Sequence, residues 1–140
     1  MTSKVFHWTL KAAGIFILGA GAMHIVLGAN ADVLLGAQVS SQSLMDAGLD
    51  SQNRFYGATF TLYGVLLLLV TRDLQRYGPV LRCLLWVFWG AGLVRFISVA
   101  LYGWPPLLMN LLFALEVVLP PLLLAWHAKL APQEADAPAP

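Results

Sequence analysis

Four long apolar runs alternate with shorter polar segments along the chain. Each run approaches the roughly 20 residues that an α-helix needs to cross a hydrocarbon core of about 30 Å. Because a helix satisfies its own backbone hydrogen bonds, it is the structure that such runs adopt in lipid. We therefore predict an all-α integral membrane protein, an antiparallel bundle formed by residues 1–130 and followed by a disordered tail, residues 131–140. The expected spans are about 12–29, 52–70, 81–102 and 106–126.

A tight turn joins the last two runs. Gly103 can end the third helix with a positive φ, and Pro105 and Pro106 suit the first turn of a helix, where backbone N–H groups lack partners anyway. These two helices are therefore expected to be antiparallel neighbours.

Each of these two runs carries one ionisable residue, Arg95 in the third and Glu116 in the fourth. A charge inside the bilayer costs at least a few kcal/mol unless it is paired, so such residues are rare and informative. At about 1.5 Å per residue, Arg95 lies roughly 10 Å and Glu116 roughly 15 Å from the turn. An arginine side chain spans this offset, and we predict an ion pair between them within the membrane.

Glycines in the first two runs recur at helical spacing. Gly14, Gly21 and Gly28 are seven residues apart, as in closely packed membrane helices, and His24 shares their face. His24 is therefore expected to point toward protein rather than lipid.

The second run carries a similar stripe of small residues, Gly57, Thr61 and Gly64, on the face of Arg54. Asp50 and Ser51 precede this run and are the expected helix cap, since their side-chain oxygens can accept from free N–H groups of the first turn. Arg54 either contributes to a polar site or extends to the lipid head groups.

The first run also resembles a signal peptide, with a basic start, an apolar middle and a small-residue pattern, Ala29-Asn30-Ala31. The run is somewhat long for a signal peptide, and it contains a histidine and the glycine stripe. We favour a retained helix, and cleavage of residues 1–31 stays open.

Composition agrees with a membrane protein, since 59% of residues are hydrophobic and 11% are charged, and the mean hydropathy is +0.75. The net charge is +1 and the eight basic residues form no stripe, so no nucleic-acid partner is expected. The single cysteine, Cys83, excludes an intrachain disulfide.

Four spans place most basic residues on one side of the membrane. These residues are Lys4, Lys11, Arg72, Arg76, Arg82 and Lys129, whereas the other side carries Asp32, Asp46 and Asp50. By the positive-inside rule, both termini are expected in the cytoplasm and the long loop outside it.

The intramembrane polar residues then lie in the outer half of the membrane or near its midplane. The predicted site comprises His24, Asp50, Arg54, Arg95, Asn110 and Glu116. The first hypothesis is an outward-facing pocket that binds a small amphiphile, a lipid head group, a quinone or an anion. The alternative is a non-catalytic accessory or assembly subunit, in which the Arg95–Glu116 pair only holds two helices together.

The sequence contains no nucleophile paired with a base and no metal-binding motif. We therefore expect no catalysis, no cofactor and no metal. Membrane lipid is an expected partner, and a homodimer or a partner membrane subunit stays open.

Several motifs resemble those of a bacterial family of small four-helix membrane proteins of unknown function. The motifs are Asp50-Ser51-Gln52-Asn53-Arg54-Phe55, Arg95-x-x-Ser98, Gly103-Trp104-Pro105 and Glu116-x-x-x-Pro120. The resemblance implies a bundle in the bacterial inner membrane with Asp50, Arg54, Arg95 and Glu116 as its polar signature, and it implies no activity. The chain is also similar in architecture to DoxX-like four-helix proteins, some of which are linked to quinone chemistry.

Overall fold

The computed structural model describes the backbone of residues 3–135 and the side chains of residues 3–130. This part of the chain forms six helices: α1 (Ser3–Leu27), α2 (Asn30–Leu34), α3 (Ser41–Leu44), α4 (Ala47–Val70), α5 (Leu74–Tyr102) and α6 (Leu107–Ala135). Of these, α1, α4, α5 and α6 are long and apolar enough to cross a membrane. The chain is therefore a multi-pass membrane protein, and the prediction of an all-helical structure with four long apolar helices is confirmed.

Each predicted span lies within one of these helices, except that Gly28, Ala29 and Pro106 fall just outside them. The helices extend past the predicted spans, most of all at the start of α1 and the end of α6. The backbone of the expected tail is helical to Ala135, and its residues 136–140 lie outside the described part of the chain.

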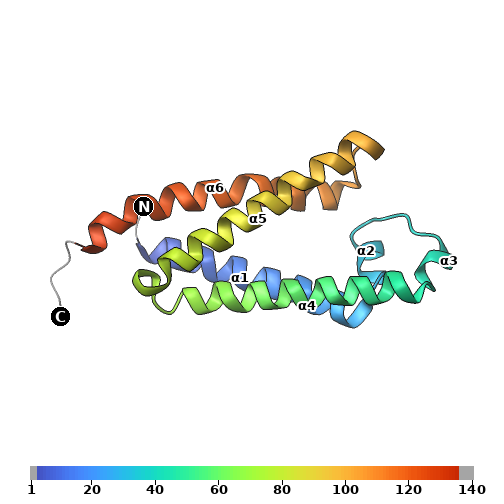
Figure 1. Cartoon of the computed structure of the whole chain (residues 1–140), viewed down its shortest axis with the longest axis horizontal. Helices are drawn as coiled ribbons and strands as arrows, with labels where there is room; N and C mark the ends of the chain where they lie inside the picture. Colours follow the sequence, from blue (N-terminus) through green and yellow to red (C-terminus); the bar gives the residue numbers. More distant parts are fainter. Residues whose placement is uncertain (1–2, 136–140) are drawn as a thin grey trace.

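The four long helices form two antiparallel pairs. The most extensive contact is between α1 and α4, and the next is between α5 and α6. Figure 1 shows the two pairs close together where α1 begins and α6 ends, and diverging toward the end that carries α2, α3 and the α5–α6 turn. We call these the terminal end and the loop end.

Glycines allow α1 and α4 to approach until their backbones touch. A Cβ atom on Gly21 would lie 2.7 Å from the Gly57 carbonyl oxygen, and one on Gly57 would lie 2.8 Å from the Gly21 carbonyl oxygen. About two turns further along α4, a Cβ atom on Gly64 would lie 2.7 Å from the backbone nitrogen of Leu18. The predicted glycine stripes therefore face each other. If α1 were cleaved as a signal peptide, one side of this contact would be lost.

The terminal end holds a buried apolar core to which all four long helices contribute. Its members are Phe6, Leu10, Ile17, Leu67, Val70, Leu81, Leu85, Leu123 and Leu130. At the edge of this core, the hydroxyl of Tyr63 on α4 donates to the Leu84 carbonyl of α5 at 2.7 Å. The core and this hydrogen bond join the two helix pairs.

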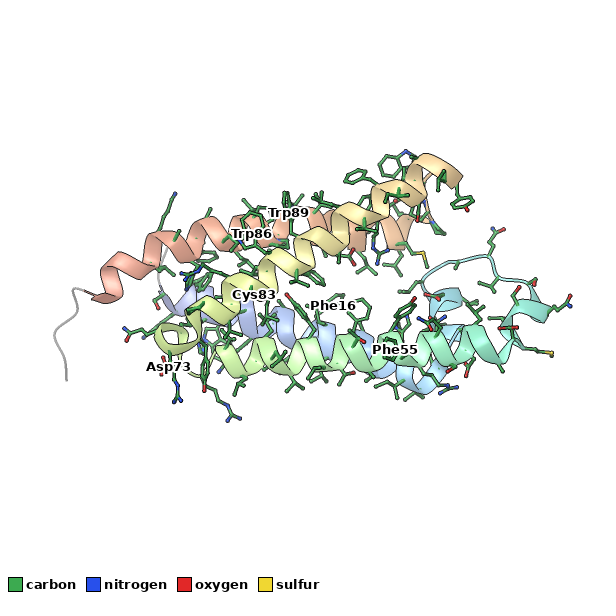
Figure 2. All side chains as sticks on the ribbon, in the orientation of Figure 1. Phe16, Phe55, Asp73, Cys83, Trp86 and Trp89 are labelled. Carbon is green, nitrogen blue, oxygen red and sulfur yellow. The ribbon has the colours of Figure 1, made fainter. Side chains whose placement is uncertain are left out.

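The outward-facing sides of the helices are rich in exposed apolar side chains. Trp86 of α5, for example, is exposed, and its ring meets that of the partly exposed Trp89 edge to face, with ring centroids 5.4 Å apart. Figure 2 shows both on the side of α5 that faces away from α1 and α4. In a membrane this surface contacts lipid, so its exposure needs no partner protein.

The start of α4 differs from the prediction. Asp46, rather than Asp50 or Ser51, caps this helix, because its Oδ1 accepts a hydrogen bond from the Leu49 backbone N–H at 2.7 Å. Asp50 lies inside the first turn. The helix thus begins about one turn earlier, and the Asp50 carboxylate is available for another contact.

We expect Gly21→Ala and Gly57→Ala to destabilise the protein by about 1–3 kcal/mol, because the added methyl group meets backbone atoms that cannot rotate away. Thermal unfolding of the detergent-solubilised protein would measure the change. Gly19→Ala is the matched control, since a Cβ atom there has nothing within 4 Å. Equal unfolding temperatures for Gly19→Ala and Gly21→Ala would contradict the glycine contact.

Candidate functional site

At the loop end, Arg54 of α4 binds the end of α1. Its Nε donates to Asp50 Oδ2 at 2.7 Å, one helical turn earlier. Its Nη1 donates to the carbonyl oxygens of Ile25 at 2.6 Å and Val26 at 3.3 Å. The last carbonyls of a helix have no N–H partner within the helix, and the helix dipole is negative at this end. A cation there therefore donates hydrogen bonds to free acceptors and is attracted by the dipole. Arg54 therefore closes the C-terminus of α1.

Asp50 requires the glycine that follows α1. Gly28 has φ +55°, and a Cβ atom on it would overlap the Asp50 carboxylate. A side chain at this position would be disfavoured by the backbone conformation and would also displace Asp50. Gly28, Asp50 and Arg54 thus form one joint between α1 and α4, which we call the α1–α4 joint.

His24 lies beside this joint and faces the glycine contact, as predicted. Its side chain is almost fully buried, its Nδ1 lies 2.9 Å from the Ala20 carbonyl oxygen, and its Nε2 lies 3.5 Å from Asp32 Oδ1. Asp32 belongs to α2, so the contact holds that short helix over the end of α1. His24 is fully engaged in local contacts.

The predicted Arg95–Glu116 ion pair is present. Arg95 Nε lies 2.6 Å from Glu116 Oε2, and Nη2 donates to Oε1 at 3.0 Å. This two-point arrangement is the stronger form of an arginine–carboxylate contact. The side chain of Glu116 is 14% exposed and that of Arg95 is 42% exposed. The acid is therefore enclosed between α5 and α6, and the guanidinium is reachable from one side.

Gly92 allows this pair to form. A Cβ atom on Gly92 would lie 3.1 Å from the Cβ of Glu116 and 3.3 Å from its carbonyl oxygen. Because Gly92 precedes Arg95 by three residues, the two share one face of α5. The absence of a side chain at Gly92 brings Glu116 within reach of Arg95.

Asn110 lies at the start of α6 and holds the α5–α6 turn. Its Nδ2 donates to the Pro105 carbonyl oxygen at 2.6 Å. Its Oδ1 is buried and has no hydrogen-bond partner within the described residues. Asn110 therefore fixes the turn and leaves one acceptor unsatisfied.

A cavity of about 300 Å³ opens between α5 and the α5–α6 turn. It is lined by Arg95, Ser98, Val99, Tyr102, Gly103, Trp104, Pro105 and Phe113. Arg95 is the one charged side chain among these eight. The Phe113 ring also meets Phe96 edge to face at 4.7 Å, which helps to fix the wall of the cavity.

The six predicted site residues thus fall into two groups. His24, Asp50 and Arg54 belong to the α1–α4 pair, whereas Arg95, Asn110 and Glu116 belong to the α5–α6 pair. Among side chains 3–130, no hydrogen bond or ion pair joins the two groups, and Arg95 is the predicted residue that lines the cavity. Three or more His, Cys, Asp or Glu side chains arranged to bind a metal ion are not found in the described residues.

The family model for the domain of unknown function DUF4345 matches residues 5–127, which include all four long apolar helices up to His127. The chain belongs to the DUF4345 family. No curated protein and no solved structure matches it. The family assignment agrees with the expected membrane domain of unknown function, whereas the individual motifs, the bacterial source and the likeness to DoxX-like proteins stay expectations.

In this DUF4345 protein, sequence reasoning did not find the contacts of Asp32 and Asp46 or the aromatic wall of the cavity. In a continuous helix His24 and Asp32 would lie about 12 Å apart along the axis. They meet because the chain reverses at Gly28. Trp104 and Tyr102 were visible only as parts of a turn. The sequence feature that could have indicated the cavity is the pair of aromatic residues, Tyr102 and Trp104, in the turn that follows the helix of Arg95.

We expect Arg95→Leu or Glu116→Leu to destabilise the protein by about 2–3 kcal/mol, because each substitution leaves one unpaired charge between membrane helices. The double variant, with both residues changed to leucine, should recover most of this loss. Denaturant titrations in detergent would measure all three. A double variant as unstable as the sum of the two single variants would show that the residues do not act as a pair.

Proposed function

We propose that this protein binds the negatively polarised head of a small amphiphile in the cavity at the α5–α6 turn. The observation that carries the proposal is a cavity with one cation, Arg95, in an aromatic and apolar wall. Such a combination is typical of sites that orient a ligand through few polar contacts while apolar walls bury the rest of it. A lipid head group, a quinone and a simple organic anion all present the oxygen acceptors that this site would bind.

The geometry of Arg95 supports this proposal. Glu116 engages Nε and Nη2, and within the described residues Nη1 has no hydrogen-bond partner. A guanidinium presents five N–H donors, so the ion pair leaves donors for a second acceptor. Glu116 would hold the guanidinium in place, and the free edge would bind the ligand.

The surroundings of Arg95 would suit an amphiphile. Tyr102 and Trp104 line the cavity and are largely exposed, at 86% and 69%. Tyrosine and tryptophan are typical of the membrane–water interface, where one end of the ring is apolar and the other wet. A ligand head at Arg95 would thus extend its apolar part along Phe113 and Val99 into the hydrocarbon region.

We further propose that the protein resides in a bacterial inner membrane, with the terminal end in the cytoplasm. The excess of basic residues in the α4–α5 turn and near both ends of the helical domain supports this orientation. The bacterial assignment comes from the motif resemblance. The cavity would then open toward the outer side.

An accessory or assembly role is the second candidate. The observation that favours it is that each arginine already has an acidic partner within the protein. Arg54 binds Asp50 and α1 carbonyls, and Arg95 binds Glu116 at two points. Pairs of this kind can hold helices together without any ligand. In that case the protein would act through a partner membrane subunit.

Native mass spectrometry of gently extracted protein would separate the two. We expect a co-purified small molecule on the wild type, with occupancy reduced at least about tenfold in Arg95→Gln, because charge-assisted hydrogen bonds contribute about 1.5–3 kcal/mol. Arg54→Gln is the matched control, since it removes the same charge from the α1–α4 joint, and it should retain the ligand. Circular dichroism would verify that both variants stay folded.

Two outcomes would contradict the pocket. One is equal occupancy in Arg95→Gln and the wild type. The other is a wild-type protein without any small molecule that arrives with a stoichiometric partner polypeptide, unaffected by either substitution. The second outcome would favour the accessory role.

A further inference from the structure

A second and larger cavity lies at the terminal end, away from Arg95. It is a groove of about 590 Å³ that is lined by one residue of α1 and one face of α6. The lining residues are Thr9, Leu119, Leu122, Leu123, Ala125, Trp126, Lys129 and Leu130. Pockets of this size accommodate small ligands. The proposed site on α5 shares no residue with it.

The groove is apolar along its length and charged at one end. From Leu119 to Leu130 the face of α6 extends roughly 16 Å, about the thickness of one leaflet. Trp126 and Lys129 are three residues apart and share this face near the end of α6. A lipid chain that lies along the leucines would therefore place its head group at Lys129.

Trp126 fixes the wall of the groove beside Lys129. Its ring meets Phe6 of α1 edge to face at 5.1 Å, which holds it between the two helices. A fixed aromatic wall next to a cation suits a lipid at the level where its acyl chain meets its head group.

The charge of the terminal end favours an anionic lipid. Six basic residues belong to the start of α1, the α4–α5 turn with the first turns of α5, and the end of α6: Lys4, Lys11, Arg72, Arg76, Arg82 and Lys129. Among the described side chains of this end, Asp73 is the one acid, and it caps α5 by accepting from the Arg76 backbone N–H at 2.9 Å. Anionic phospholipids are attracted to such basic clusters.

We propose that this groove binds one anionic phospholipid, with an acyl chain along the α6 leucines and beside the Trp126 ring, and with the phosphate at Lys129. The site is independent of the proposed function, because it uses other residues at the other end of the molecule.

The test is native mass spectrometry of delipidated protein incubated with dioleoyl phosphatidylglycerol or dioleoyl phosphatidylcholine. We expect the wild type to retain one phosphatidylglycerol about fivefold more tightly than phosphatidylcholine, as for one lysine beside an anionic lipid. Lys129→Gln should abolish this preference. Trp126→Ala removes the ring that forms the wall beside Lys129, so it should weaken retention of both lipids and leave the preference intact.

Lys11→Gln is the matched control, because Lys11 belongs to the same end but lies over the Trp8 ring, 5.0 Å from its centroid, and does not line the groove. It should behave as the wild type. The proposal is overturned if the wild type retains no lipid, if it retains the two lipids equally, or if Lys129→Gln and Lys11→Gln give the same preference.

Discussion

The direct backbone contact between α1 and α4 is the constraint on which the polar residues of the loop end depend. Gly21 and Gly57 leave no side chain between the helices, and their close backbone contact sets the register of α1 against α4. That register places the last carbonyls of α1 beside Arg54, which binds them. The α1–α4 joint is therefore a consequence of glycine packing, and its charges serve the fold.

The α5–α6 pair is built differently. Its loop end is held by one ion pair, by the Gly92 contact that permits it, and by Asn110 at the turn. The two pairs share their apolar core at the terminal end and diverge from there (Figure 1). At the loop end, Pro106 approaches the segment after α2, 3.1 Å from the position of a Cβ atom on Gly36. Both arginines are partly exposed, Arg95 at 42% and Arg54 at 47%. They differ in that Arg95 lines a cavity, whereas Arg54 binds the last carbonyls of α1.

Much of this structure follows from local patterns in the sequence. Run length predicted the four long helices, and a short turn between two charged helices predicted the Arg95–Glu116 pair. Heptad spacing predicted that the glycines form packing faces, which could equally have served a homodimer. Each of these depends on residues close in sequence or on the geometry of a single helix. The start of α4 was the exception, since Asp50 or Ser51 was the expected cap and Asp46, four residues before Asp50, caps the helix instead.

The grouping of the polar residues could not be predicted in the same way. Helical periodicity says which residues share a face, but in a bundle each face can meet any of several neighbours. The sequence therefore suggested one site for all six residues, whereas the structure pairs α1 with α4 and α5 with α6. The contact between His24 and Asp32 depends on the chain reversal at Gly28, which no helical spacing encodes.

Arg54 is held by Asp50 and by two carbonyls of α1, whereas Arg95 lines a cavity at the α5–α6 turn. Nuclear magnetic resonance of the arginine Nε–H groups separates these two environments, during titration with butyl phosphate, an anion too short to form micelles. We expect a saturable shift of the Arg95 signal and no saturable shift of the Arg54 signal. Signals that saturate together would contradict the proposed site, because they would place both arginines in one pocket.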